Sequence, residues 1–199
     1  AYLSHSKYGI DYEININNNS SYKTGYSALL STNQQTYPGT YGDSSTYNEP
    51  YNTATGYLAS TTGNISGIYD MSGGAQEYVA LYISGNVGSS GFTTATLANY
   101  DSKYFDVYNA SSGVSTYQYR ILGDATGEMG PFKNFVDEDN YPRWHNSWYG
   151  DYSAFVESKY PWFVRGSNYG GGLLSGQFYF NGQTGGANSD FSFRIVLAP

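Results

Sequence analysis

The chain of 199 residues contains no cysteine. This absence excludes disulfide bonds, thiolate metal sites and cysteine nucleophiles together. Histidine is nearly absent as well, because only His5 and His145 occur and they do not form a His-x-x-x-His pair. Iron and zinc sites built from several imidazoles are therefore not expected. We interpret each histidine as an ordinary polar residue and expect no transition metal and no cofactor.

Charge is scarce. Charged residues make up 13% of the chain, against about 25% in ordinary soluble domains, so solubility must come from hydroxyl, amide and backbone groups. The formal net charge is −7, and the nine lysines and arginines are scattered along the sequence. Proteins that bind a phosphate backbone do so with clustered basic side chains. Nucleic acid is therefore not an expected partner.

Long apolar runs are missing too. No stretch approaches the roughly 18 apolar residues of a membrane span, and the start lacks the basic region and apolar core of a signal peptide. Residues 1–8 instead predict a short helix closed by Gly9. We expect no direct membrane contact from this segment. We interpret residues 1–199 as a single domain from the C-terminal part of a longer protein, whose anchor or signal would lie upstream.

Aromatic and small polar residues are abundant instead. The 24 Tyr, 10 Phe and 3 Trp supply the aromatic area that disordered chains lack, so the chain is expected to fold. Tyrosine combined with glycine, serine and asparagine is typical of antibody paratopes, where tyrosine gives rigid contact area and the small residues give adaptable hydrogen bonds. The same composition is also typical of β-rich structure, and both interpretations stay open.

The pattern along the chain predicts one α+β domain. Residues 11–63 are rich in turn-forming residues and predict long surface loops held together by their own tyrosines. A turn at 67–71 leads into a buried strand at 77–83. Gly-rich turns separate three further strands, and the whole C-terminal end predicts a small antiparallel sheet. These strands are expected at 162–166, 177–181 and 192–197. Residues 100–108 fit either a helix or an irregular insertion.

Three segments resemble, in order and spacing, the formylglycine-generating-enzyme branch of the C-type lectin fold. Residues 69–79 (YDMSGGAQEYV) resemble the family's YDMSGNVWEWV block, residues 164–167 (VRGS) its RGGSW, and residues 193–196 (FRIV) its terminal GFRVV. Gly74, Ala75 and Gln76 replace the family's Asn-Val-Trp, and Tyr78 replaces its second Trp. The resemblance implies an α+β C-type lectin-like fold of this type, with small antiparallel sheets, few helices and long loops.

Charged residues within these segments are expected to serve the fold. Glu77, Arg165 and Arg194 are interpreted as holding loops and strands together through buried charge-assisted hydrogen bonds rather than as touching a ligand. The large apolar side chains of residues 162–165 and 193–196 are expected in the core.

Catalysis is not expected. The formylglycine-generating enzymes work through a pair of cysteines, and the related sulfoxide synthases need several histidines, which this chain lacks. No Gly-x-Ser-x-Gly turn for a serine nucleophile occurs, and nothing singles out a pair of carboxylates for glycoside hydrolysis. We interpret the chain as not an enzyme, with a degenerate enzyme domain as a distant alternative.

The C-terminal tail is similar to the variable region of proteins diversified by retroelements, and to pilin-linked surface proteins of gut bacteria. This similarity implies a receptor or adhesin domain on a bacterial or phage surface, or secreted, that binds a protein or glycan on another cell or host. A structural pilin or surface-layer domain without a specific ligand is the alternative. The similarity leaves the oligomeric state open. The expected ligand-binding residues are Asn168, Tyr169, Gly170, Gly171, Leu173, Leu174, Gln177, Tyr179, Gly182, Gln183 and Thr184.

Two further segments allow two interpretations each. The calcium-binding triplets of sugar-binding C-type lectins are absent, so calcium-bridged sugar binding is not expected. Asp137, Glu138, Asp139 and Asn140, with Asp151 downstream, either gather oxygen ligands for a structural calcium ion or form a solvated acidic loop. Residues 143–149 (RWHNSWY) have the composition of a sugar-stacking site or protein hot spot, and equally that of a core edge.

Overall fold

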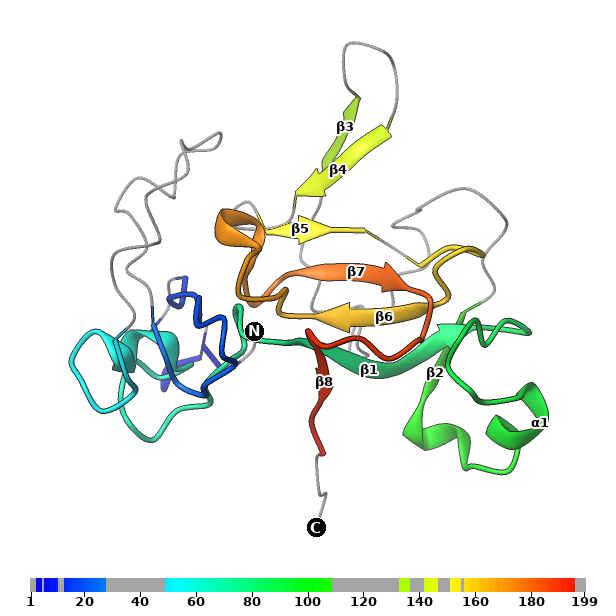
Figure 1. Ribbon diagram of the computed structural model, residues 1–199, viewed down its shortest axis with the longest axis horizontal. Coiled ribbons are helices and arrows are strands. Elements are labelled where there is room, and N and C mark those ends of the chain that lie inside the picture. The colour runs from blue at the N-terminus through cyan, green and yellow to red at the C-terminus, as the bar shows by residue number, and fades with distance from the viewer. Residues whose placement is uncertain are drawn as a thin grey trace.

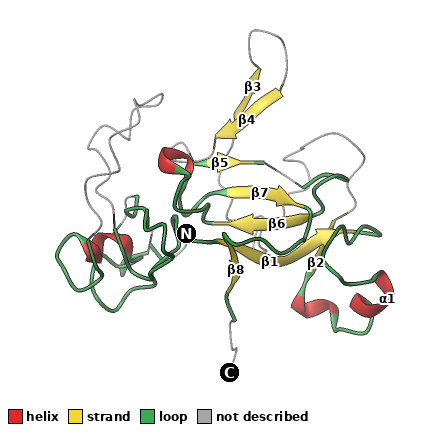
Figure 2. Ribbon diagram, in the orientation of Figure 1, coloured by secondary structure: helices red, strands yellow, loops and turns green. Residues whose placement is uncertain are grey.

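The computed structural model describes residues 3–4, 6–10, 13–27, 49–108, 133–136, 142–146, 151–154 and 156–195. Within these ranges the chain has a mixed α/β structure with a single open sheet and few helices, and loops connect most of its elements (Figure 2). The predicted mixture of strands with few helices is confirmed at this level, but the strands form one sheet with parallel and antiparallel pairs rather than small antiparallel sheets.

The sheet has eight strands, and its order is β2-β1-β6-β7-β5-β4-β3, with β8 beside β1 and off this path. The β3–β4 hairpin lies at one end of the sheet and the pair β1–β2 at the other (Figure 1). The strands are β1 (Gln76–Ile83), β2 (Asp106–Tyr108), β3 (Lys133–Val136), β4 (Pro142–Asn146), β5 (Tyr152–Ser153), β6 (Trp162–Arg165), β7 (Phe180–Gln183) and β8 (Phe191–Phe193).

Strand β1 forms because residues 78–83 (YVALYI) are an apolar run rich in aromatic and β-branched side chains, as the sequence predicted. It pairs antiparallel with β6, in a register that sets Glu77 opposite Arg165. Its first three residues also pair parallel with β8, and its last three pair parallel with β2. β1 is therefore held by three strands.

The C-terminal strands differ from the prediction in two respects. β6 and β7 are antiparallel as expected, but β7 begins at Phe180 because Tyr179 N–H donates to the Gly176 carbonyl at 3.0 Å, closing a turn over residues expected in the strand. β8 does not continue this antiparallel sheet. The loop after β7 carries the chain past β6, and β8 pairs parallel with the start of β1 instead.

The core lies against the centre of the sheet. Phe163 of β6 and Phe180 of β7 are completely buried and meet edge to face, with ring centroids 4.6 Å apart. The buried cluster around them is completed by Leu81, Ile83, Tyr108 and Val156. A second cluster joins Trp162 to Tyr82 and Leu97, and the Tyr82 and Trp162 rings stack at 5.3 Å. The prediction that residues 162–164 belong to the core is confirmed.

The expected core role of residues 193–195 is wrong. Phe193 is 73% exposed and Ile195 is 76% exposed. The reason is that β8 bonds to β1 only as far as Phe193, and the chain then leaves the sheet. Val196, the last of the residues 193–196 that were expected in the core, lies outside the described residues.

The N-terminal segment also departs from the sequence prediction. The described residues before Gly9 form turns rather than a helix, with Gly9 N–H bonded to the Ser6 carbonyl at 2.9 Å. Residues 13–17, expected in a surface loop, are all buried. Distant segments supply the partners that make this burial tolerable, because Asn15 N–H donates to the Leu58 carbonyl and Asn17 N–H donates to the Ser72 carbonyl, both at 2.8 Å.

The helices are single turns at the edges of the sheet. They are α1 (Thr94–Leu97) and the 3₁₀ helices η2 (Gly56–Ala59), η3 (Ser102–Tyr104) and η7 (Gly172–Leu174). Thr93 caps α1 by accepting a hydrogen bond from Thr96 N–H. The sequence allowed either a helix or an irregular insertion at residues 100–108. The structure has the short helix η3 and the strand β2 there. None of the helices in the described ranges is long and apolar enough to cross a membrane.

Two buried carboxyl groups lie close together beneath the loop before β7. Asp151 is completely buried, and its Oδ2 accepts the Phe178 N–H at 2.8 Å. A Cβ at Gly176 would lie 2.0 Å from both carboxylate oxygens, so only glycine fits there. Burial, and then the nearby Glu13, raise the pKa of Asp151. Burial raises the pKa of Glu13 from 4.5 to about 8.

The core and the exposed edge strand predict different costs of truncation. Phe163→Ala should lower the free energy of unfolding by about 3–5 kcal/mol, because it removes a buried ring from the main cluster. Phe193→Ala should change it by about 0.5 kcal/mol or less, because that ring is exposed. Urea denaturation of the two variants measures both values. Equal losses would contradict the position of β8.

Glu13 predicts a specific pH dependence of stability. Its pKa is raised on folding, so between about pH 4.5 and 8 the native state binds a proton that the unfolded state has released. The contribution of Glu13 to the free energy of unfolding therefore falls as pH rises through this window. Glu13→Gln should be more stable than the wild type at the upper end and show a flatter profile.

Urea denaturation across the same window tests this, with Glu157→Gln as a control at a half-exposed turn. A stability difference between wild type and Glu13→Gln that does not change with pH would contradict the burial of a protonated Glu13.

Candidate functional site

A pocket of about 240 Å³ opens between the start of β1, the loop after β6 and the strands β5 and β7. We call it the amide pocket, because three of its lining side chains are carboxamides. Its lining residues are Gln76, Tyr152, Ser167, Asn168, Gly171, Leu174, Tyr179 and Asn181.

The loop after β6 is shaped by two successive residues in the left-handed region. Gly166 has φ +80° and Ser167 has φ +63°, which turns the chain sharply at the end of the strand. Asn168 then fixes the loop, because its Oδ1 accepts Gly170 N–H at 3.1 Å and its Nδ2 donates to Asp190 Oδ2 at 2.7 Å. Asp190 is itself tied to β1, since its carbonyl accepts Gln76 N–H at 2.8 Å.

Two tyrosines form the opposite wall. The rings of Tyr152 and Tyr179 pack at 5.6 Å between centroids, and Asn181 Nδ2 donates to the Tyr179 hydroxyl at 3.2 Å. Burial raises the pKa of Tyr179 to about 12. Burial, with a smaller effect from the Glu157 charge, also raises the pKa of Tyr152. Both phenols are therefore protonated at neutral pH and can donate and accept hydrogen bonds.

Gln76 contributes an acceptor without a partner. The residue is 8% exposed, and its Oε1 receives no hydrogen bond from the part of the chain that the structure describes. None of the described side chains that line the amide pocket carries a charge. Hydroxyls, carboxamides and aromatic rings can bind a polar, uncharged group, but they offer no general base or activated nucleophile for catalysis.

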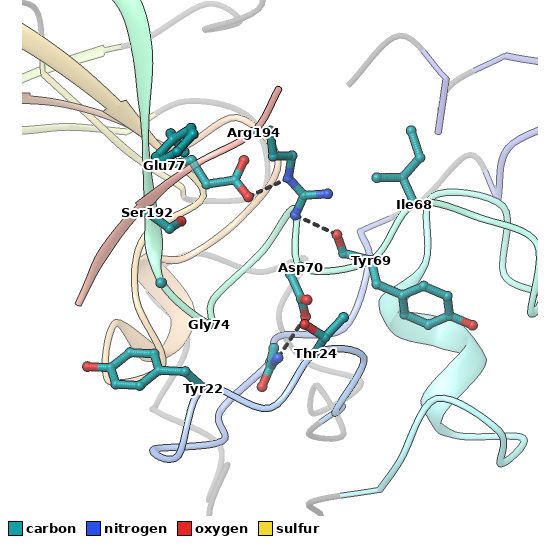
Figure 3. A pocket seen from close by; sticks show the side chains of 12 residues that line it. Tyr22, Thr24, Ile68, Tyr69, Asp70, Gly74, Glu77, Ser192 and Arg194 are labelled. Atoms are coloured by element: carbon teal, nitrogen blue, oxygen red, sulfur yellow. Dashed lines mark hydrogen bonds and ion pairs between the residues drawn. The ribbon is translucent and has the colours of Figure 1, made fainter. Parts of the chain in front are cut away.

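A larger cleft of about 600 Å³ lies between β8, the start of β1 and the N-terminal segments (Figure 3). We call it the Arg194 cleft. Its lining residues are Asn17, Tyr22, Thr24, Ile68, Tyr69, Asp70, Gly74, Ala75, Glu77, Ser192, Phe193 and Arg194.

The charged groups of the Arg194 cleft hold its walls together. Arg194 Nε donates to Glu77 Oε1, and its Nη2 donates to the Tyr69 carbonyl at 2.8 Å, so one side chain links β8, β1 and the segment before β1 (Figure 3). Burial raises the pKa of Glu77, and the Arg194 charge opposes this shift. Asp70 Oδ1 accepts Asn17 Nδ2–H at 2.7 Å and Gly25 N–H at 3.0 Å.

The charged residues make the charge-assisted hydrogen bonds predicted for them, but the bond between Arg194 and Glu77 is not buried as expected, because the Arg194 side chain is 36% exposed. Glu77 and Arg194 form an ion pair, and Arg165 Nη2 donates to the Gln177 carbonyl at 2.8 Å while its guanidinium lies 4.5 Å from the centroid of the Phe180 ring. The expected roles are therefore filled by contacts within the fold.

The amide pocket and the Arg194 cleft lie on opposite sides of the start of β1. Gln76 lines the first and Glu77 lines the second, and consecutive side chains of a strand point to opposite faces. Tyr169 connects the two regions, because its N–H donates to the Gly74 carbonyl at 2.7 Å and its ring meets Tyr22 edge to face at 5.4 Å.

The structure brings part of the predicted ligand-binding set together. Asn168, Gly171, Leu174 and Tyr179 line the amide pocket. Gly170 is exposed in the same loop. Leu173 belongs to η7.

The remaining predicted residues lie away from the pocket lining. Gln177 is 2% exposed, and its Oε1 accepts the buried Ser4 hydroxyl at 2.7 Å, so it belongs to the interior. Gly182 is also buried within β7. Gln183 is paired with Trp162 as the last residue of β7 rather than lying in a loop, and the Thr184 carbonyl accepts Ser89 N–H at 2.7 Å.

Four residues that line the amide pocket were not predicted from the sequence, namely Gln76, Tyr152, Ser167 and Asn181. For Gln76 a signal existed, because a carboxamide stands where the resembling family has tryptophan. Tyr152 and Asn181 come from strands whose position beside the tail follows from the sheet order, and no local pattern marks them.

The two segments with open interpretations are only partly described. Residues 137–140 lie outside the described residues, whereas Asp151 faces the interior. Residues 142–146 form β4, and residues 147–149 are outside the described part. Among the described residues, no group of three or more histidine, aspartate or glutamate side chains could hold a metal ion.

Comparisons with protein-family models, with curated proteins and with solved structures found no match for the chain.

Proposed function

We propose that the chain is a non-enzymatic ligand-binding domain, a receptor or adhesin displayed on a bacterial or phage surface or secreted, with the C-type lectin-like fold of the formylglycine-generating-enzyme type. Its ligand is a protein or a glycan on another cell. The observation that carries the proposal is that Asn168, Gly171, Leu174 and Tyr179, selected from the C-terminal tail as binding residues, line one pocket.

The fold assignment is supported by contacts among the three segments that resemble the family. Gly73 N–H, in the first segment, donates to the Gly166 carbonyl of the second at 2.7 Å. Tyr78 of the first segment pairs with Phe193 of the third. Arg194 then joins the third segment to Glu77 of the first. The first segment therefore contacts the second and the third, which are distant in the sequence, and this proximity supports the proposed fold.

Binding without catalysis is supported by the chemistry of the two hollows. The amide pocket is lined by uncharged side chains, and the pKa of each of its phenols is raised. In the Arg194 cleft the carboxylates of Asp70 and Glu77 accept hydrogen bonds from the fold itself. Such groups suit recognition, where orientation of polar atoms gives specificity.

A structural pilin or surface-layer domain is the second candidate, and β8 favours it. β8 lies at an edge, beside β1 and off the main path of the sheet, and it presents the exposed Phe193 with Ile195 just beyond it. An edge strand with exposed apolar side chains is a template for pairing with another chain. This candidate predicts self-association through β8 rather than binding of a foreign ligand.

The test replaces two residues of the amide pocket that are only partly buried. Leu174→Ser and Asn181→Ser should abolish binding to a panel of bacterial and host cells, measured by flow cytometry, because each removes a contact surface of the amide pocket. Their melting temperatures should stay close to that of the wild type, since neither residue is fully buried. Ile65→Ser and Asn99→Ser are the matched controls, at exposed positions outside the pocket.

The outcome separates the two candidates. Unchanged cell binding by both pocket variants would contradict the proposed site. Fibres or oligomers of the wild type in sedimentation experiments, removed by Phe193→Ser, together with no binding to any cell, would favour the structural candidate.

A further inference from the structure

We propose that the amide pocket takes one uncharged sugar residue, recognised through its hydroxyl groups without a metal ion. The inference rests on the proposed function, since it names the chemical class of the ligand for the same pocket. It is drawn from the size, the hydrogen-bonding groups, the apolar surfaces and the charge of the pocket.

The volume limits the ligand. About 240 Å³ is available, below the roughly 300–1,000 Å³ of pockets that enclose drug-sized molecules. A single six-membered sugar ring with its hydroxyl groups is a ligand of suitable size. A longer glycan would have to place one terminal residue in the pocket and extend into solvent.

The polar lining fits hydroxyl groups. The carboxamides of Gln76, Asn168 and Asn181 each combine donor hydrogens with an acceptor oxygen, and a sugar hydroxyl likewise donates and accepts. Two neighbouring hydroxyls of a sugar ring can therefore bind one carboxamide, one hydroxyl donating to its oxygen and the other accepting from its N–H. The side chain of Gln76 adds a third carboxamide to this lining from the start of β1.

Two of these carboxamides are oriented before any ligand arrives. Asn168 is fixed by Asp190 and Gly170, and Asn181 is fixed by the Tyr179 hydroxyl. In both side chains Nδ2 carries two hydrogens, and the observed bond to Asp190 or Tyr179 uses one of them. A preorganised site loses less side-chain entropy on binding, which matters for a ligand as small as one sugar residue.

The apolar lining fits the carbon-bound hydrogens of a sugar ring. Tyr152 and Tyr179 present packed rings, and Leu174 adds an aliphatic side chain from η7. A sugar has polar edges and less polar faces, so it matches a pocket that combines aromatic surface with carboxamides. A wholly polar ion or a wholly apolar ligand would leave half of this lining unmatched.

The charge of the site selects uncharged sugars. Asp190 lies directly behind Asn168, and its buried Oδ1 has no hydrogen-bond partner in the described part of the chain. Among the residues that the structure describes, no lysine or arginine lines the pocket to balance a second negative charge. Uronic and sialic acids would bring a second carboxylate toward Asp190, and the repulsion between the two like charges is unfavourable.

The experiment measures binding of the wild-type chain to arrays of neutral and acidic glycans, with a protein array in parallel, followed by titration calorimetry with the best free sugar. Glycans ending in a neutral sugar should bind, and a chelator should leave their affinity unchanged. Asn181→Leu, which keeps the side-chain size but removes the carboxamide, should lower affinity about tenfold or more. Asn99→Leu, at an exposed position outside the pocket, should match the wild type.

Tyr152→Phe provides a second variant in case Asn181→Leu lowers the melting temperature, because it keeps the ring and removes only the hydroxyl. It should weaken binding of the same sugar several-fold. Equal affinity in the wild type and both variants would overturn the proposal, and so would binding that is restricted to acidic glycans or lost in chelator.

Different results would contradict the sugar ligand and the ligand-binding function. Protein ligands that bind through the pocket, with no glycan bound, would overturn the sugar inference and leave the ligand-binding function standing. Absence of binding to both arrays would count against the function itself.

Discussion

The antiparallel pairing of β1 with β6 fixes the position of both hollows in the molecule. Glu77 stands opposite Arg165 in this register, and the other edge of β1 is shared between β8 and β2. Because consecutive residues of β1 face opposite ways, Gln76 closes the amide pocket and Glu77 closes the Arg194 cleft. A shift of one residue in this register would exchange the two faces and remove both sites.

Side-chain hydrogen bonds connect parts of this chain that are far apart in the sequence. The Ser4 hydroxyl donates to Gln177 across 173 positions, and Asn168 ties the loop after β6 to Asp190. Buried hydrogen bonds of this kind are costly to leave unmade, so they select one arrangement of the loops. This explains how a chain with only 13% charged residues positions its loops. It also explains why the amide pocket is lined by carboxamides and phenols.

The sequence predicted elements whose cause is local. β1 and β6 are runs of apolar and aromatic residues, and the loop at Asn168 follows from glycine-rich composition. It could not predict that β8 would pair parallel with β1, leaving Phe193 exposed, because that depends on how the loop after β7 crosses the sheet. Only some of the residues that line the amide pocket were predicted, because most of the others come from strands that are distant in the sequence. Tyr152 and Asn181 reach it through the order of the strands, which no local pattern encodes.

The most direct measurement is a titration followed by nuclear magnetic resonance, observing the side-chain amide signals of Gln76, Asn168, Asn181 and Asn99. The account predicts that a bound ligand shifts the first three signals, because their carboxamides line the pocket, and leaves that of Asn99 unchanged. A ligand that binds without moving the three signals, or that shifts the Arg194 Nε signal instead, would contradict the claim that the amide pocket is the binding site.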